Sequence, residues 1–153
     1  MNAFDPDVIF DALNRHHVEY VVIGGIATTI LGGDCVNGDL DICHRRSGQN
    51  LAALALAVQH LDADPAAVSD SDTFSVKTYA GSLDCHATPA GTKGYEDLIE
   101  SSWRFDLAGR EMRVSSVDAL IRMKTAANRS IDRIDLEELH SLKQLIESGG
   151  DSS

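Results

Sequence analysis

A six-residue stretch with strict alternation constrains the fold more than any other part of the sequence. In residues 38–43, Leu40 and Ile42 alternate with Asp39 and Asp41. Successive side chains of a β-strand point to opposite faces of the sheet. The pattern therefore predicts a strand that buries Leu40 and Ile42 in the core and carries both carboxylates on its other face.

Two carboxylates on one strand face predict a cation site. Asp39 and Asp41 would lie about 6–7 Å apart, which is the rise of two residues along a strand. Unpaired carboxylates this close repel each other, so that one of them tends to stay protonated. A divalent cation removes the repulsion, and oxygen ligands of this kind suit Mg²⁺ or Mn²⁺.

Asp84 is the candidate for a third carboxylate, because it stands between Leu83 and Cys85 in another apolar segment. If that segment forms a strand beside residues 38–43, three carboxylates converge. Three carboxylates can hold two metal ions, which stabilise the attacking and leaving oxygens of a phosphoryl or nucleotidyl transfer. The alternative is a solvated aspartate at the edge of a hairpin.

The glycine pair Gly24-Gly25 stands between an apolar, β-branched segment (18–23) and a short helical one (26–31), and 13 residues separate it from Asp39. A strand, a glycine turn and a helix bring backbone N–H groups to a place where phosphates can dock. A plain tight turn is the alternative for the glycine pair taken alone. The combination with Asp-x-Asp favours a nucleotide site.

Periodicity and turn residues predict the remaining elements. The expected order is a helix (6–16), a strand (18–23), a short helix (26–31), a strand (38–43), a helix (48–61), two strands flanking Gly81-Ser82 (73–80 and 82–87), a helix (95–102), a hairpin (104–116) and two helices (117–129 and 132–147). Ser115 with Asp118 is expected to cap the first of these two helices, and Gly149-Gly150 to end the second.

A mixed α/β or α+β fold, with a central sheet covered by helices, follows from this alternation of elements. Residues 1–148 are expected to form a single domain with 149–153 as a frayed tail.

The charge balance limits the possible partners. The chain has 153 residues and a formal net charge of −11, which disfavours general nucleic-acid binding because phosphate contacts dominate that affinity. Basic residues nevertheless gather in the C-terminal third, where a polyanion could bind: Arg104, Arg110, Arg113, Arg122, Lys124, Arg129 and Arg133.

Cysteine usage and hydropathy predict a cytoplasmic protein. The three cysteines include no Cys-x-x-Cys pair, which argues against a disulfide framework. No apolar run approaches the length of a membrane span, and the N-terminus lacks the pattern of a secretory signal. No membrane partner is expected.

Three segments carry a resemblance to a known family. Residues 21–43, which contain the glycine pair and Asp-x-Asp, look like the signature of the DNA-polymerase-beta-like nucleotidyltransferases. Residues 82–102 resemble the strand of the third aspartate and its following helix, and residues 117–139 resemble a helix pair of the pattern K-x-x-A-x-R-x-x-D-x-x-D-L. More narrowly, the chain resembles the small AbiEii-type nucleotidyltransferases found as toxins in bacterial toxin–antitoxin systems.

The resemblance implies a minimal nucleotidyltransferase fold and a role for each matching residue. Asp39, Asp41 and Asp84 would be metal ligands for Mg²⁺ or Mn²⁺, with Asp84 also a possible general base. The residues implied for nucleotide binding are Gly24, Gly25, Thr28, Lys124 and Arg129, with Asp132 and Asp135 bridging to Arg129.

Four positions depart from the family pattern. Ile26 follows the glycine pair where a serine is usual, so that Thr28 and Thr29 are the nearest hydroxyls. Cys35 and Asn37 stand where an arginine and a threonine are common, and Ile131 where a lysine often precedes the helix-pair aspartate. Contacts to the nucleotide or the acceptor are therefore expected to differ.

Further residues near the aspartates are candidates of lower rank. His86 shares the face of Asp84, and Arg45 and Arg46 follow the Asp-x-Asp strand, where they could touch a triphosphate or remain solvated. The repeated Cys-His pairs at 43–44 and 85–86 do not favour zinc, because adjacent strand residues face opposite sides.

The expected function is transfer of a nucleoside monophosphate from an NTP to a hydroxyl of RNA, in particular tRNA, or of a protein, with a cognate toxin or antitoxin as partner. One alternative is a nucleotide-binding or degenerate partner module with little catalysis. Another is an antibiotic nucleotidyltransferase, since an acidic surface attracts a cationic aminoglycoside, although the chain looks short for such an enzyme.

Overall fold

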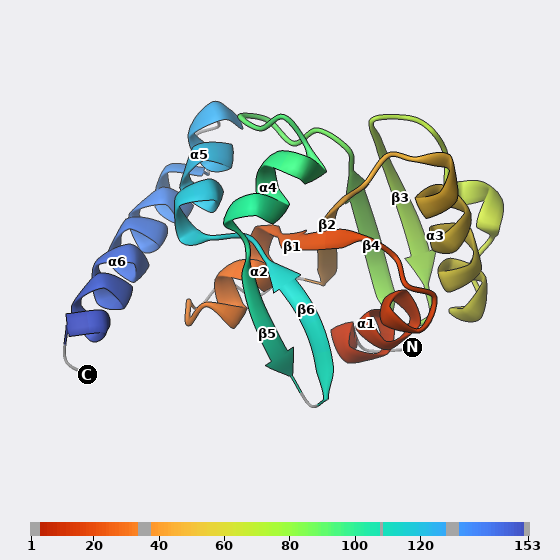
Figure 1. Ribbon diagram of the computed structural model, residues 1–153, viewed down its shortest axis with the longest axis horizontal. Coiled ribbons are helices and arrows are strands. Elements are labelled where there is room, and N and C mark those ends of the chain that lie inside the picture. Colours follow the sequence, from red (N-terminus) through yellow and green to blue (C-terminus); the bar gives the residue numbers. More distant parts are fainter. Residues whose placement is uncertain (1–3, 34–37, 108, 128–131, 152–153) are drawn as a thin grey trace.

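The computed structural model describes residues 4–33, 38–107, 109–127 and 132–151, which form six α-helices, one 3-10 helix and six strands (Figure 1). The elements are α1 (Pro6–Arg15), β1 (Tyr20–Ile23), α2 (Gly24–Ile30), β2 (Asp39–His44), α3 (Gly48–His60), the 3-10 helix (Pro65–Ala67), β3 (Thr73–Thr78), β4 (Gly81–His86), α4 (Tyr95–Ser101), β5 (Trp103–Leu107), β6 (Arg110–Val114), α5 (Val117–Ala127) and α6 (Asp132–Asp151). Apart from the 3-10 helix, this is the predicted order, and the mixed α/β fold is confirmed.

The six strands form one mixed sheet in the order β3-β4-β2-β1-β6-β5. β2 pairs with β4 in parallel and with β1 in antiparallel fashion, and β1 pairs with β6 in parallel. The β3–β4 and β5–β6 hairpins complete the two edges. β2 therefore lies inside the sheet, next to β4, although α3 and β3 separate these two strands in the chain.

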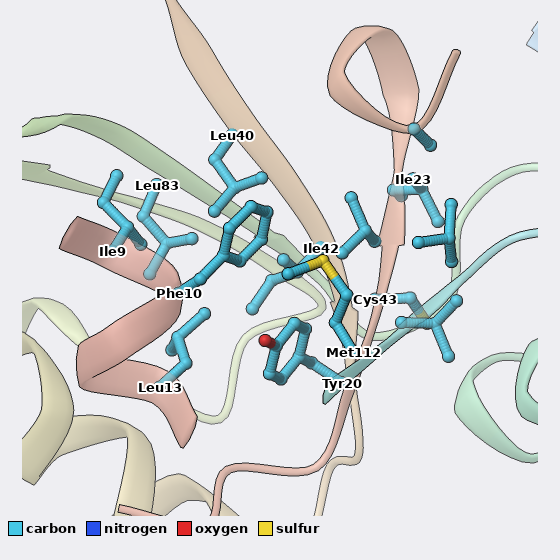
Figure 2. Close-up of a cluster of buried hydrophobic side chains, with 14 of the residues drawn as sticks. Ile9, Phe10, Leu13, Tyr20, Ile23, Leu40, Ile42, Cys43, Leu83 and Met112 are labelled. Atoms are coloured by element: carbon cyan, nitrogen blue, oxygen red, sulfur yellow. The ribbon is translucent and has the colours of Figure 1, made fainter. Parts of the chain in front are cut away.

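The alternation in β2 has the predicted effect on burial. Leu40 and Ile42 are fully buried, as is Leu83 on β4, and α1 brings Ile9 and Phe10 over this face of the sheet (Figure 2). Burying one such side chain contributes about 1.5–3 kcal/mol. Truncation of Leu40 to alanine is therefore expected to cost about 2–5 kcal/mol, and the core holds β2 in place.

Serine hydroxyls cap two of the helix starts, α3 and α5. The hydroxyl of Ser47 accepts a hydrogen bond from the backbone N–H of Asn50 at 3.2 Å and caps α3. At α5, the hydroxyl that accepts from the N–H of Ala119 belongs to Ser116, at 3.2 Å, and not to Ser115. Ser115 instead donates its N–H to the carbonyl of Val22 at 2.9 Å, so that it still belongs to the pairing of β6 with β1.

Two other boundaries differ from prediction. α6 continues through the glycine pair to Asp151 rather than ending before it. The β3–β4 turn lies at Tyr79-Ala80, and Gly81 is the first residue of β4. α6 is the longest described helix, but neither it nor another described helix has an apolar stretch that could span a membrane.

Candidate active site

Asp41 and Asp84 face each other across two neighbouring strands. The register of the parallel β2–β4 pair places Asp41 opposite Asp84, and Asp39 opposite Ser82. Residues two apart on a strand share a face, so Asp39, Asp41 and Asp84 lie on the face opposite to the buried Leu40. Adjacent strands are about 4.8 Å apart, which brings the two facing aspartates together as the sequence pattern requires.

A neighbouring side chain contacts each facing carboxylate. Nε2 of His86 lies 3.2 Å from Oδ1 of Asp41, and the hydroxyl of Ser82 donates to Oδ1 of Asp84 at 3.3 Å. The side chains of Asp41 and His86 are 23% and 31% exposed, whereas Asp39 is exposed. The side chains of Asp41 and His86 are thus partly buried and still reachable from solvent.

The donor set fits a hard cation held by two carboxylates. Within residues 4–33, 38–107, 109–127 and 132–151, no three His, Cys, Asp or Glu side chains are placed to hold a metal ion together. Mg²⁺, however, is commonly bound through one or two carboxylates plus substrate phosphates and waters. Asp41 and Asp84 supply two such carboxylates on one face.

Gly24 packs directly against the Asp41 carboxylate. It starts α2 with a φ of 71°, and a Cβ atom at this position would lie 2.6 Å from Oδ2 of Asp41. Ile23, the residue before it, is the register partner of Asp41. The hydroxyl of Thr28 donates to the carbonyl of Gly24 at 3.2 Å, which ties the glycine turn to the first turn of α2. The backbone of the turn therefore approaches the carboxylate as no side-chain-bearing residue could.

A cavity of about 240 Å³ opens beside Asp41 and Gly24. It brings together five of the residues expected at the site: Gly24, Thr28, Asp41, His86 and Lys124. The rest of its wall is apolar and consists of Ile23, Pro89, Ala90, Leu120, Met123, Ala127 and Leu139. The cavity thus combines a polar side at Asp41 and His86 with an apolar side formed largely by α5 and α6.

The apolar wall was not predicted from the sequence. Pro89 and Ala90 belong to the connection between β4 and α4, and Leu139 lies on α6. The period of α5 does place Leu120 and Met123 on neighbouring turns. No local pattern, however, indicates that this helix face and residues 89–90 meet beside β2.

Several predicted residues lie away from the cavity. As far as the described residues define it, the cavity wall lacks Asp39, Asp84 and Gly25. Arg45 and Arg46 follow the opposite end of β2, where Arg45 pairs with Glu19 at 3.1 Å and Arg46 with Asp70 at 3.0 Å. Positions that lie outside the described residues, wholly or in their side chains, are Cys35, Asn37, Arg129, Ile131, Asp132 and Asp135.

Three of the basic residues of the C-terminal third are paired with carboxylates. Arg104 pairs with Glu111 at 2.9 Å and Arg122 with Asp97 at 3.0 Å. Arg110 forms two hydrogen bonds with the carboxylate of Asp11. These pairs weaken the expected basic surface, because a phosphate would have to compete with a carboxylate already in place.

The two cysteines beside the aspartates are neutral. Burial raises the pKa of the Cys43 thiol to about 12, and the carboxylates of Asp72 and Asp97 add to the effect. Burial likewise raises the pKa of Cys85, which the charges of Asp84 and Asp41 raise further. The thiolate is the form that binds metals and attacks electrophiles, so burial disfavours both thiols as metal ligands or nucleophiles.

Comparison with solved structures places the fold among nucleotidyltransferases. The lincosamide antibiotic adenylyltransferase LnuA superposes with a TM-score of 0.62 at 17% identity, over 92% of this chain and 99% of that one. ANT(2")-Ia in complex with adenylyl-2"-tobramycin gives 0.60 at 19% identity, over 94% and 95%. An antigenic nucleotidyltransferase-like protein from Paracoccidioides brasiliensis gives 0.54 at 14% identity, over 95% and 79%.

At these identities the likeness shows the fold. No family model and no curated protein sequence matches the chain. The near-complete coverage of LnuA and ANT(2")-Ia corrects one expectation. This chain is not short beside these two proteins, so its length does not set it apart from them.

Proposed function

We propose that this protein is a metal-dependent nucleotidyltransferase that moves a nucleoside monophosphate from an NTP to a hydroxyl acceptor. One observation carries the proposal. Asp41 and Asp84 face each other on adjacent parallel strands, with Gly24 packed against the Asp41 carboxylate. A fold shared with nucleotidyltransferases supports the same reading.

The proposed reaction is a displacement at the α-phosphorus. The acceptor oxygen forms a bond to that phosphorus, the bond from the phosphorus to the bridging oxygen breaks, and pyrophosphate leaves. Asp84 takes the proton of the acceptor hydroxyl. A bound Mg²⁺ or Mn²⁺ would neutralise the charge that develops on the phosphate oxygens.

Other residues hold the substrates in place. Asp39, Asp41 and Asp84 would bind the cation, and the Gly24-Gly25 turn and Lys124 would bind the phosphates. Thr28 lies on the cavity wall and supports the glycine turn. Arg129 would contact the nucleotide and Asp132 would bridge to Arg129, as the resemblance to the family implies.

The acceptor belongs to one of two classes. The resemblance to AbiEii-type toxins favours an RNA or protein hydroxyl in the cytoplasm, in a toxin–antitoxin pair. A small-molecule acceptor is favoured by two other observations, the offset basic residues and the fold shared with LnuA and ANT(2")-Ia. We place the small molecule first, because a chain with a net charge of −11 and paired arginines offers the backbone of a nucleic acid little attraction.

The experiment that tests this is incubation of the purified protein with each α-labelled NTP, Mg²⁺ and fractions of a cell extract. Label is expected in one acceptor fraction, and an Asp41→Asn variant should transfer none. Lincosamides and aminoglycosides are added as defined acceptors in parallel. Folded protein that labels no fraction and no defined acceptor contradicts the proposal.

Calorimetry separates an enzyme from a binding module. NTP binding that requires Mg²⁺ and is lost in Asp41→Asn supports the enzyme. Binding that persists when both Asp39 and Asp41 are changed to asparagine supports a module that keeps the pocket without the chemistry.

A further inference from the structure

His86 contacts a carboxylate of the candidate active site from a neighbouring strand, and the proposed reaction gives it no role. It ends β4 and is the register partner of Cys43, two pairs beyond the facing aspartates. By the alternation of the strand it shares the face of Asp84. Its imidazole reaches across to β2, where Nε2 lies 3.2 Å from Oδ1 of Asp41. His86 also lines the cavity.

The Asp41 carboxylate is held from two sides. His86 contacts Oδ1, and Oδ2 lies against Gly24, at a distance that leaves no room for a Cβ atom. Since a carboxylate is only an acceptor, the contact with His86 is a hydrogen bond donated by Nε2–H. Rotation of the carboxylate would break this bond on one side and meet backbone on the other.

The surroundings strengthen this bond. Both side chains are less than one third exposed, so water competes less for the donor and the acceptor than at the surface. A carboxylate whose orientation is already set loses less conformational freedom when it binds a cation. Partners that orient metal ligands in this way contribute about 10–100-fold to metal affinity in other proteins.

We propose that His86 is a positioning residue that orients the Asp41 carboxylate for the divalent cation. This inference rests on the proposed function, because it assigns Asp41 to the cation. His86 acts through Asp41 and need not touch the cation or the nucleotide. Ser82 bears the same relation to Asp84, through a weaker contact between two residues of one strand.

Titration of Mn²⁺ into the purified chain tests the inference, with free Mn²⁺ followed by its electron paramagnetic resonance signal. His86→Leu is expected to weaken Mn²⁺ binding about 10–100-fold. His86→Gln is expected to restore binding to within a few-fold of wild type, because its amide N–H reaches about as far as Nε2–H. Restored binding in His86→Gln distinguishes an orienting hydrogen bond from mere filling of space.

His60→Leu is the matched control. His60 is an exposed histidine at the end of α3 whose Nε2 lies 3.2 Å from a guanidinium nitrogen of Arg15, and its loss should leave Mn²⁺ binding unchanged. Urea unfolding of each variant verifies that the chain is folded.

Each contrary outcome has one meaning. A folded His86→Leu variant that binds Mn²⁺ as well as wild type overturns the role of His86 alone. The same follows if a folded His86→Gln variant binds as poorly as His86→Leu. A wild-type chain that takes up no Mn²⁺, alone or with a non-hydrolysable ATP analogue, overturns the proposed function and this inference together.

Discussion

Gly24 and Asp41 are packed so closely that the backbone of one residue and the carboxylate of the other exclude any additional atom. A Cβ at Gly24 would lie 2.6 Å from Oδ2 of Asp41, and the φ of 71° at Gly24 is one that residues with a side chain rarely adopt. The glycine turn and the carboxylate are thus one structural unit, although they come from different elements.

Gly24→Ala is therefore expected to disable the site. The added methyl group must displace the Asp41 carboxylate or the turn, and we expect NTP binding to fall at least about tenfold, the equivalent of 1.4 kcal/mol. Gly109→Ala is the matched control, since Gly109 has a φ of 81° with nothing described within 4 Å of an added Cβ. Calorimetry with Mg²⁺ measures both. Equal effects of the two substitutions would show that backbone strain, and not contact with Asp41, decides the result.

Asp84→Asn is expected to stabilise the metal-free protein while it abolishes transfer. Like charges directly opposite each other on neighbouring strands are destabilising, typically by about 0.2–1 kcal/mol, and asparagine removes one charge while its amide oxygen still accepts from Ser82. Urea unfolding in EDTA should show a gain of this size. Mg²⁺ should stabilise wild type more than the variant, because the cation offsets the same repulsion.

Asp64→Asn controls for the charge change itself. Asp64 is exposed and accepts a hydrogen bond from the N–H of Ala66 at 2.9 Å, a role that asparagine fills equally well. The unfolding free energy of the Asp64→Asn variant should equal that of wild type. A metal-free Asp84→Asn variant less stable than wild type would mean that the facing carboxylates do not repel.

The buried side chain of His44 is expected to make the fold sensitive to acid. It is fully buried, neither of its ring nitrogens has a hydrogen-bond partner among the described residues, and its ring stacks edge-on against Phe74. Burial, reinforced by nearby His86 and Arg46 and opposed by Asp72, lowers the pKa of His44 from 6.5 to about 4. The folded state therefore holds His44 neutral over a range in which the unfolded chain binds a proton.

The sign of the pH dependence of stability follows from this difference in the pKa of His44 between the folded and the unfolded chain. The contribution of His44 to stability is complete above pH 6.5 and is lost as the pH falls toward 4, by about 3 kcal/mol in total. His44→Leu should flatten the fall in unfolding free energy over this range, whereas His60→Leu should keep it. Urea unfolding at a series of pH values checks both, and identical slopes in wild type and His44→Leu would refute the assignment.

Gly91 fixes the wall of the cavity next to α5. It has a φ of 80°, and a Cβ there would lie 2.8 Å from both the carbonyl oxygen of Arg122 and Cβ of Ala126. Gly91→Ala should push the neighbouring Pro89 and Ala90 away from α5, lower stability by about 1–3 kcal/mol and weaken NTP binding. Gly109→Ala is again the control, because it introduces the backbone strain of a positive φ without a close contact for the added Cβ. An equal effect of Gly109→Ala on stability and NTP binding would contradict a packing role for Gly91.

The sequence predicted the parts of the site that have a local pattern. The period-two alternation placed Leu40 and Ile42 in the core and Asp39 and Asp41 on the other face, because strand geometry alone decides it. The position of His86 on the face of Asp84 followed from the same rule. That the strand of Asp84 lies beside that of Asp41 was only a conditional prediction, since pairing across α3 and β3 depends on the whole topology.

Tertiary packing decided what the local rules missed. Ser115 fits a capping pattern as well as Ser116 does, but its N–H is used by the pairing with Val22, which moves the cap by one residue. Pro89 and Leu139 carry no signal of a cavity, because their role exists only once α5, α6 and the β4–α4 connection surround β2.

The pairing of β2 with β4 has a consequence for how such a chain can change. Residues 61–72 join α3 to β3 outside the sheet, so insertions there leave both aspartates where they are. Loss of a single residue inside β4 would instead turn Asp84 into the apolar interior and Leu83 toward solvent. Insertions and deletions should therefore accumulate in the connections between elements, while the lengths of β2 and β4 stay constant together.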